Sequence, residues 1–174
     1  MGSMSDPHAQ IGDDVEVGAE TRIWPFASVI RRAKIGRACN IASCAIVDGA
    51  VIGDRCLIGH GAQVHPGARL GNDVFVGPGA ILCNDRWPRT GKADFDTGLL
   101  LRRELVTVDV ADGASIGAGA IILPGAAVGS GAMIAAGAVV AESVPAGHLF
   151  KRNGSMVRIE PGRPPNRLRR AAAA

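Results

Sequence analysis

The sequence predicts an all-β chain wound as a parallel β-helix, and two observations carry that prediction. The first is a strict six-residue period between Val110 and Val140, in which an aliphatic residue recurs with a small or branched residue two positions before it. A helix repeats near 3.6 residues and a strand near 2, so neither explains this period, whereas a fixed short period is typical of a parallel β-helix. The second is composition, because 24 of the 174 residues are glycine and only 3% are aromatic, as a narrow aliphatic core requires.

The repeats fall into three blocks, which we take as one domain with a C-terminal segment at 141–174. The period runs over Ile11–Val47, changes phase by one residue, runs again over Ile52–Leu82, and returns over 108–140. The phase change at Asp48–Gly49 predicts a shortened turn. If three hexads form one coil, the repeats make roughly six stacked coils.

Residues 83–107 interrupt the period with polar, charged and aromatic residues. A segment of this length must leave a regular solenoid as one long inserted loop, and long loops on rigid scaffolds often carry function. The alternative is a surface loop without a function. Trp87 argues against it, because a large amphipathic ring on a loop usually packs against a partner. After the third block, the repeats end, and His148–Ile159 reads as a short extended return segment before a disordered end.

Charge and cysteine usage narrow the functional class. A formal net charge of +3 is too small to indicate nucleic-acid binding. No apolar run suits a membrane helix and no signal peptide precedes the repeats, so we expect a cytoplasmic protein. The four cysteines form no CxxC pair, and Cys39 and Cys56 occupy the small inward position of their hexads. We interpret all four as structural or incidental residues of a protein in a reducing compartment.

One motif carries a resemblance to a known family. The run Asn84–Arg89 (NDRWPR) begins the inserted loop and follows Asp73–Pro78 (DVFVGP). With these residues the chain resembles the hexapeptide-repeat acyltransferases, in particular the nucleotide-amino-sugar N-acetyltransferases of surface polysaccharide (lipopolysaccharide) biosynthesis. The resemblance implies a left-handed β-helix, a homotrimer with active sites between subunits, and a nucleotide-linked amino sugar as acceptor. It implies that Asn84 holds the acceptor amine, and it suggests as substrate-binding residues Asp85, Arg86, Trp87 and Arg89.

The same resemblance implies acetyl-CoA as co-substrate. Its long arm would run along the third block, where small residues let it lie close to the backbone. The positions concerned are Gly117, Ala118, Ala135 and Ala136. Lys151 and Arg152 would then meet its phosphates, as a point charge and a fork; the alternative is that these two cations are simply solvated.

Two histidines are candidates for the proton acceptor that amine attack on a thioester requires. His60 and His65 stand five residues apart, and imidazole titrates in a useful range. Their spacing also resembles the γ-class carbonic anhydrases, but zinc with two protein ligands is a poor site. The other histidines, His8 and His148, lie in terminal segments, so we expect no metal. Open alternatives are a γ-carbonic anhydrase-like zinc protein, acetyl transfer to another small amine or hydroxyl, a non-enzymatic trimeric scaffold, and two histidines lying in turns without a role.

Overall fold

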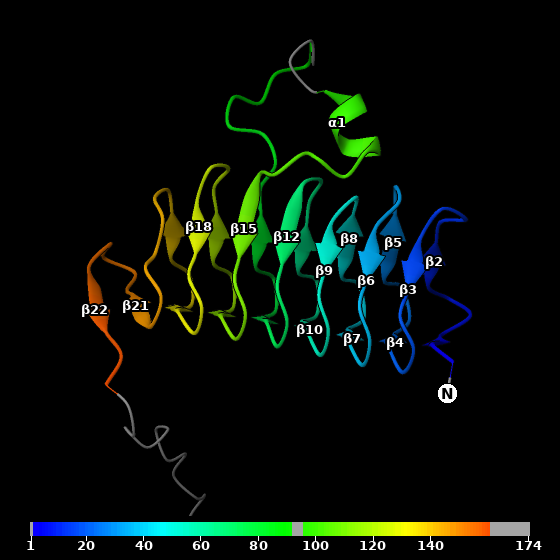
Figure 1. Ribbon diagram of the computed structural model, residues 1–174, viewed down its shortest axis with the longest axis horizontal. Coiled ribbons are helices and arrows are strands. Elements are labelled where there is room, and N and C mark those ends of the chain that lie inside the picture. The colour runs from blue at the N-terminus through cyan, green and yellow to red at the C-terminus, as the bar shows by residue number, and fades with distance from the viewer. Residues whose placement is uncertain (1, 92–95, 161–174) are drawn as a thin grey trace, which may run out of the picture.

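The computed structural model describes residues 2–91 and 96–160 and shows a parallel β-helix. Short strands stack along one axis, with the N-terminal strands at one end of the stack and β21 (His148–Phe150) and β22 (Met156–Arg158) at the other (Figure 1). Each coil contributes one strand to each of three sheets, which we name A, B and C in the order in which the chain visits them. The predicted all-β parallel β-helix is confirmed. Its left-handed winding stays a prediction.

The strands are two or three residues long. Sheet A contains β1 (Met4–Ser5), β4 (Arg22–Ile23), β7 (Asn40–Ile41), β10 (Leu57–Ile58), β13 (Phe75–Val76), β16 (Ser115–Ile116), β19 (Met133–Ile134), β21 (His148–Phe150) and β22 (Met156–Arg158). Sheet B contains β2 (Gln10–Ile11), β5 (Ser28–Ile30), β8 (Ile46–Asp48), β11 (Gln63–Val64), β14 (Ile81–Leu82), β17 (Ile121–Ile122) and β20 (Val139–Val140). Sheet C contains β3 (Glu16–Val17), β6 (Lys34–Ile35), β9 (Val51–Ile52), β12 (Ala68–Leu70), β15 (Val108–Val110) and β18 (Ala127–Val128).

The core consists of the residues that define the six-residue period. Both the aliphatic and the residue two before it point inward, so Val47 and its partner Ala45 are both 0% exposed. Successive coils place Val29, Val47 and Val64 in register. The coil from Val47 to Val64 is one residue shorter than the coil from Val29 to Val47, and it contains Asp48–Gly49. The shortened turn predicted there is therefore present.

The β-helix extends further at both ends than the sequence predicts. Strand β1 pairs with β4 although Met4 and Ser5 are exposed, so the pairing leaves no inward apolar signature to recognise. At the other end Val144 bridges to Val128, and Phe150 on β21 is 3% exposed. The estimate of roughly six coils is therefore too low. A ring as large as that of Phe150 fits because no regular parallel coil follows, and β22 returns antiparallel to β21.

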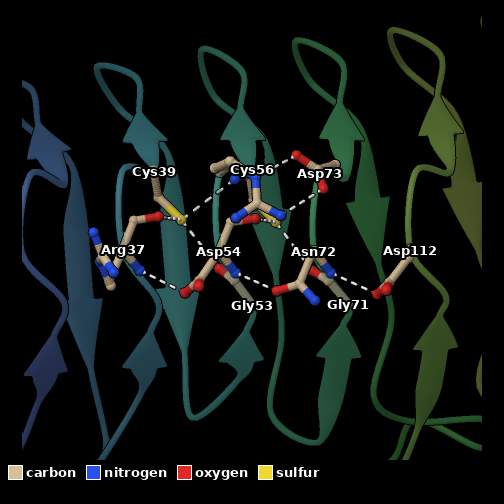
Figure 2. A network of polar contacts seen from close by, with 10 residues as sticks. Arg37, Cys39, Gly53, Asp54, Cys56, Gly71, Asn72, Asp73 and Asp112 are labelled. Carbon is tan, nitrogen blue, oxygen red and sulfur yellow. Dashed lines mark hydrogen bonds and ion pairs between the residues drawn. The ribbon is translucent and has the colours of Figure 1, made fainter.

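A ladder of polar side chains joins the turns between sheets C and A (Figure 2). Asp54, Asn72 and Asp112 each accept a hydrogen bond from the backbone N–H one coil earlier, at 2.7–2.8 Å. Beside it, the thiols of Cys39 and Cys56 donate to the carbonyls of Gly53 and Gly71, each at 3.1 Å. These bonds satisfy turn groups that parallel stacking leaves unpaired.

The inserted segment leaves the cylinder after β14 and returns before β15, as Figure 1 shows. Its return half contains α1 (Thr97–Leu101), a short helix capped by the Asp96 side chain, which the sequence does not predict. Leu100 is 6% exposed and packs over Gly49. Arg103 then reaches Glu16 with Nη2 to Oε1 at 2.6 Å. Among the described residues, no helix is long and apolar enough to cross a membrane.

Candidate functional site

The candidate site residues gather on two edges of sheet B. We call the turns that lead from sheet A into sheet B the A–B corner, and the turns that lead from sheet B into sheet C the B–C corner. Both corners repeat once in every coil, so residues far apart in sequence line up along the axis. The strands of sheet B lie between the two rows.

His65 and Asn84 lie together at the B–C corner. Val64 pairs with Leu82, so His65 is registered with Cys83, and Asn84 comes one residue further on the next coil. Adjacent strands are about 4.8 Å apart, which brings the two candidate side chains close. Both are partly exposed, and the imidazole Nε2 lies 3.2 Å from Gln63 Oε1.

The loop that follows Asn84 bends toward the C-terminal coils. The Asp85 carboxylate accepts a hydrogen bond from the Trp87 N–H at 2.9 Å, which makes a tight turn. The Arg86 guanidinium lies over Gly125, where an added Cβ would meet it at 3.5 Å. Trp87 is 75% exposed, and Arg89 is exposed as well. Within one chain, therefore, the indole is left available for a ligand or a second copy of the chain.

A buried carboxylate completes this corner. Asp48 ends β8 and is registered with His65, because Val47 pairs with Val64. It is 7% exposed, and burial raises its pKa despite the opposing charges of Arg31 and His65. Burial also raises the pKa of Cys83, so that thiol stays protonated and is a poor nucleophile. Sequence reasoning missed Asp48, although an acidic residue at the phase change was a visible signal.

The A–B corner carries the other candidates in one row. Backbone bonds of 2.9 Å repeat from coil to coil, with Gly79 donating to His60, Gly119 to Pro78 and Gly137 to Ala118. His60, Pro78, Ala118 and Ala136 thus occupy equivalent positions. A parallel row holds Gly117, Ala135 and Lys151, by the register of β16, β19 and β21.

This row has the shape that a long flexible ligand needs. Ala118 and Ala136 are exposed, and a Cβ added at Gly119 would meet nothing within 4 Å. At its end the Arg152 side chain lies against Gly137, 3.7 Å from an added Cβ. Small residues leave the backbone accessible, and the two cations Lys151 and Arg152 stand where the row stops.

His60 borders a hollow of about 400 Å³ that the sequence did not predict. Its walls include Trp24, Leu57 and Phe75, all partly exposed on or next to sheet A. The Trp24 indole donates to Asn40 at 2.7 Å, which fixes one wall. The structure therefore separates the two histidines, with His60 at one corner and His65 at the other.

The geometry offers no metal site among residues 2–91 and 96–160. No group of three or more His, Cys, Asp or Glu side chains in that part of the chain could hold an ion. Because His60 and His65 lie on opposite edges of sheet B, they do not converge on one point. The zinc interpretation lacks a coordination geometry on these residues.

Two repeat-family models match the chain. Residues 49–84 match the bacterial transferase hexapeptide model of six repeats, and residues 108–142 match the hexapeptide repeat of succinyl-transferase. A 50-residue stretch is 42% identical to the bifunctional protein GlmU of Koribacter versatilis, covering 29% of this chain and 11% of that protein. The chain thus spans about a tenth of that relative.

Solved structures share the fold at low sequence identity. The acetyltransferase domain of PglB from Neisseria gonorrhoeae has a TM-score of 0.59 at 20% identity, covering 87% of this chain and 55% of that one. Perosamine N-acetyltransferase from Caulobacter crescentus, in complex with CoA and GDP-perosamine, gives 0.55 at 20% identity, with 87% and 53% covered. WeeI from Acinetobacter baumannii gives 0.55 at 23% identity, with 88% and 57% covered. The chain therefore contains hexapeptide repeats of the bacterial transferase type at residues 49–84 and 108–142, and it has the fold of these solved structures.

Proposed function

We propose that the protein transfers the acetyl group of acetyl-CoA to the amino group of a nucleotide-linked amino sugar. One observation carries the proposal: Asn84 and its loop stand at one edge of sheet B, while a bare row ending in Lys151 and Arg152 follows the other edge. The first suits a polar acceptor, and the second suits a long arm with terminal phosphates. The complexes of the perosamine enzyme with CoA and GDP-perosamine support these ligand classes.

The reaction requires little from the protein beyond positioning and proton transfer. The amine nitrogen attacks the thioester carbonyl, the C–N bond forms, the C–S bond breaks, and CoA leaves as a thiolate. The Asn84 side-chain oxygen orients the amine by accepting one of its hydrogen bonds. His65, registered beside it, takes the proton that the amine loses and can return it to the thiolate. Turn N–H groups supply donors for the oxyanion.

The two rows cannot meet within one chain, because sheet B lies between them. We infer that the site closes when the A–B corner of one chain faces the B–C corner of another. A closed ring of three identical chains forms three such sites. The exposed Trp87 and the loop would then contact the neighbouring chain. This arrangement makes the acetyltransferase a homotrimer in which one chain alone is incomplete.

A screen of nucleotide-linked amino sugars with acetyl-CoA tests the proposal, with thiol release and mass spectrometry as readouts. We expect one class of amino sugar to gain 42 Da (one acetyl group) with kcat/KM in the ordinary enzyme range, about 10⁴ M⁻¹s⁻¹ or more. Turnover of a simple amine or hydroxyl alone would favour the second candidate acceptor class. Stoichiometric zinc with CO₂ hydration and no thiol release would overturn the transferase interpretation.

A further inference from the structure

One buried charged side chain, that of Asp48, takes no part in the proposed steps of the transfer reaction. Within residues 2–91 and 96–160, Asp48 is the sole buried Asp, Glu, Lys or Arg. Isolated buried carboxylates are costly unless paired and hydrogen-bonded. Its Oδ1 lies 3.1 Å from Arg31 Nε, but the geometry is not that of a hydrogen bond, and the oxygen has no hydrogen-bond partner in the structure.

The position of Asp48 links it to the catalytic row. Asp48, His65 and Cys83 follow one another on successive coils of sheet B, through the pairs Val47–Val64 and Val64–Leu82. The carboxylate thus stands one coil behind the imidazole, and Asn84 stands one coil ahead of it. A charge on His65 lowers the pKa of Asp48, as expected for a carboxylate registered with the imidazole on the neighbouring coil.

The other groups near this pair are accounted for. Arg31, 58% exposed in its side chain, faces the carboxylate from the preceding coil. Gln63 contacts the imidazole from its own strand, and Cys83 holds a neutral thiol on the next coil. The inserted segment returns to the β-helix through Arg102 and Arg103. Arg102 forms an ion pair with Glu104, and Arg103 forms one with Glu16. Asp48 is therefore the anion available to His65 from the described strands.

We propose that Asp48 is the positioning residue that makes His65 a competent base. When the neutral amine attacks the thioester carbonyl, the proton that its nitrogen loses moves to the imidazole, and the Asp48 carboxylate stabilises the imidazolium. The proton then leaves with the CoA thiolate, so the pair returns to its starting state. This inference rests on the proposed transfer reaction for its purpose, but the expected charge coupling needs no substrate and can be tested in the free protein.

NMR titration of the Asp48 side-chain carboxyl in the full chain measures that coupling without any substrate. In His65→Gln we expect the Asp48 pKa to rise by about half a unit or more, because the stabilising cation is gone. His148→Gln, at the far end of the helix, is the matched control and leaves the titration in place. Asp48→Asn assigns the resonance. An unchanged Asp48 titration in folded His65→Gln overturns the proposal.

The kinetic arm uses the acceptor found by the screen. Asp48→Asn should lower kcat about tenfold or more and move the acidic limb of the kcat/KM profile to lower pH, while KM for acetyl-CoA stays constant. A purely structural role would not move that limb, so an unshifted limb counts against the proposal. If no acceptor is turned over while the NMR coupling is present, the proposed transfer reaction is wrong, but the interaction between Asp48 and His65 is supported. If transfer occurs without coupling, only the pair fails.

Discussion

His65 and Asn84 lie at the same corner of neighbouring coils, with Asn84 one residue beyond the position registered with His65. Nothing local in the sequence joins them, because 18 residues of one full coil separate His65 from Cys83. Parallel stacking alone brings this imidazole and this amide to neighbouring positions. The number of residues in each coil therefore determines that these two candidate residues become neighbours.

Asn84→Ala should remove one oriented contact to the acceptor amine. We expect kcat/KM to fall about tenfold to a hundredfold, equivalent to roughly 1–3 kcal/mol. Asn84 is only partly buried and lies outside the inward rows, so thermal unfolding should stay close to that of the unmodified chain. Steady-state kinetics and calorimetry check this. Unchanged kinetics on the true acceptor, or a collapsed melting temperature, would contradict the role.

Asp48→Asn should stabilise the protein at neutral pH. Burial raises the folded-state pKa above the ordinary 3.8, so the folded chain holds this proton more tightly than the unfolded chain. Below pH 3.8 both states are protonated and the ionisation adds nothing. As pH rises above 3.8 through the raised folded pKa, the folded state loses stability, and neutral pH carries the full penalty.

Urea unfolding at pH 4 and pH 7 measures that difference. The stability of Asp48→Asn relative to the unmodified chain should be more favourable at pH 7 than at pH 4. An equal difference at both pH values, or the opposite order, would show that Arg31 and His65 fully offset the desolvation. A stability gain coupled to lost activity would mark Asp48 as a functional residue kept at a cost.

Leu100→Ala should loosen the inserted segment without unfolding the β-helix. Leu100 packs over Gly49 and is the buried anchor of α1. Limited trypsin digestion should then cut faster after Arg102 and Arg103, while the main melting transition stays in place. Leu101→Ala is the matched control, because that side chain is 52% exposed. Equal cutting rates for both variants would rule out the anchoring role.

Two glycines at turns between sheets C and A should respond differently to the same substitution. A Cβ at Gly53 would lie 2.5 Å from the Gly71 carbonyl, next to the ladder in Figure 2. Gly131 has φ of +62° but open space around an added Cβ. Gly53→Ala should cost about 3 kcal/mol or more, and Gly131→Ala about 1 kcal/mol from left-handed strain. Denaturant titration would refute this account if the two costs were equal.

The six-residue period was sufficient to predict the core, because inward positions obey packing rules that the sequence displays directly. Val47 and Ala45 are buried as the pattern requires. The period could not predict β1, where backbone pairing needs no apolar residue, or α1, whose five residues carry no helical period. Nor could it predict that Asp48 lies beside His65, because that relation depends on how many residues fill the coil between them.

The central claim is that Asn84 and the row ending at Lys151 and Arg152 meet across two chains. Mixed trimers test it most directly. Asn84→Ala chains and Lys151→Ala/Arg152→Ala chains, each with strongly reduced activity alone, are unfolded together and reassembled at equal ratio. If each site takes one element from each of two neighbouring chains, random assembly restores about a quarter of the sites. Recovered activity near that level is the predicted result, and mixed trimers with no activity above either parent would contradict the claim.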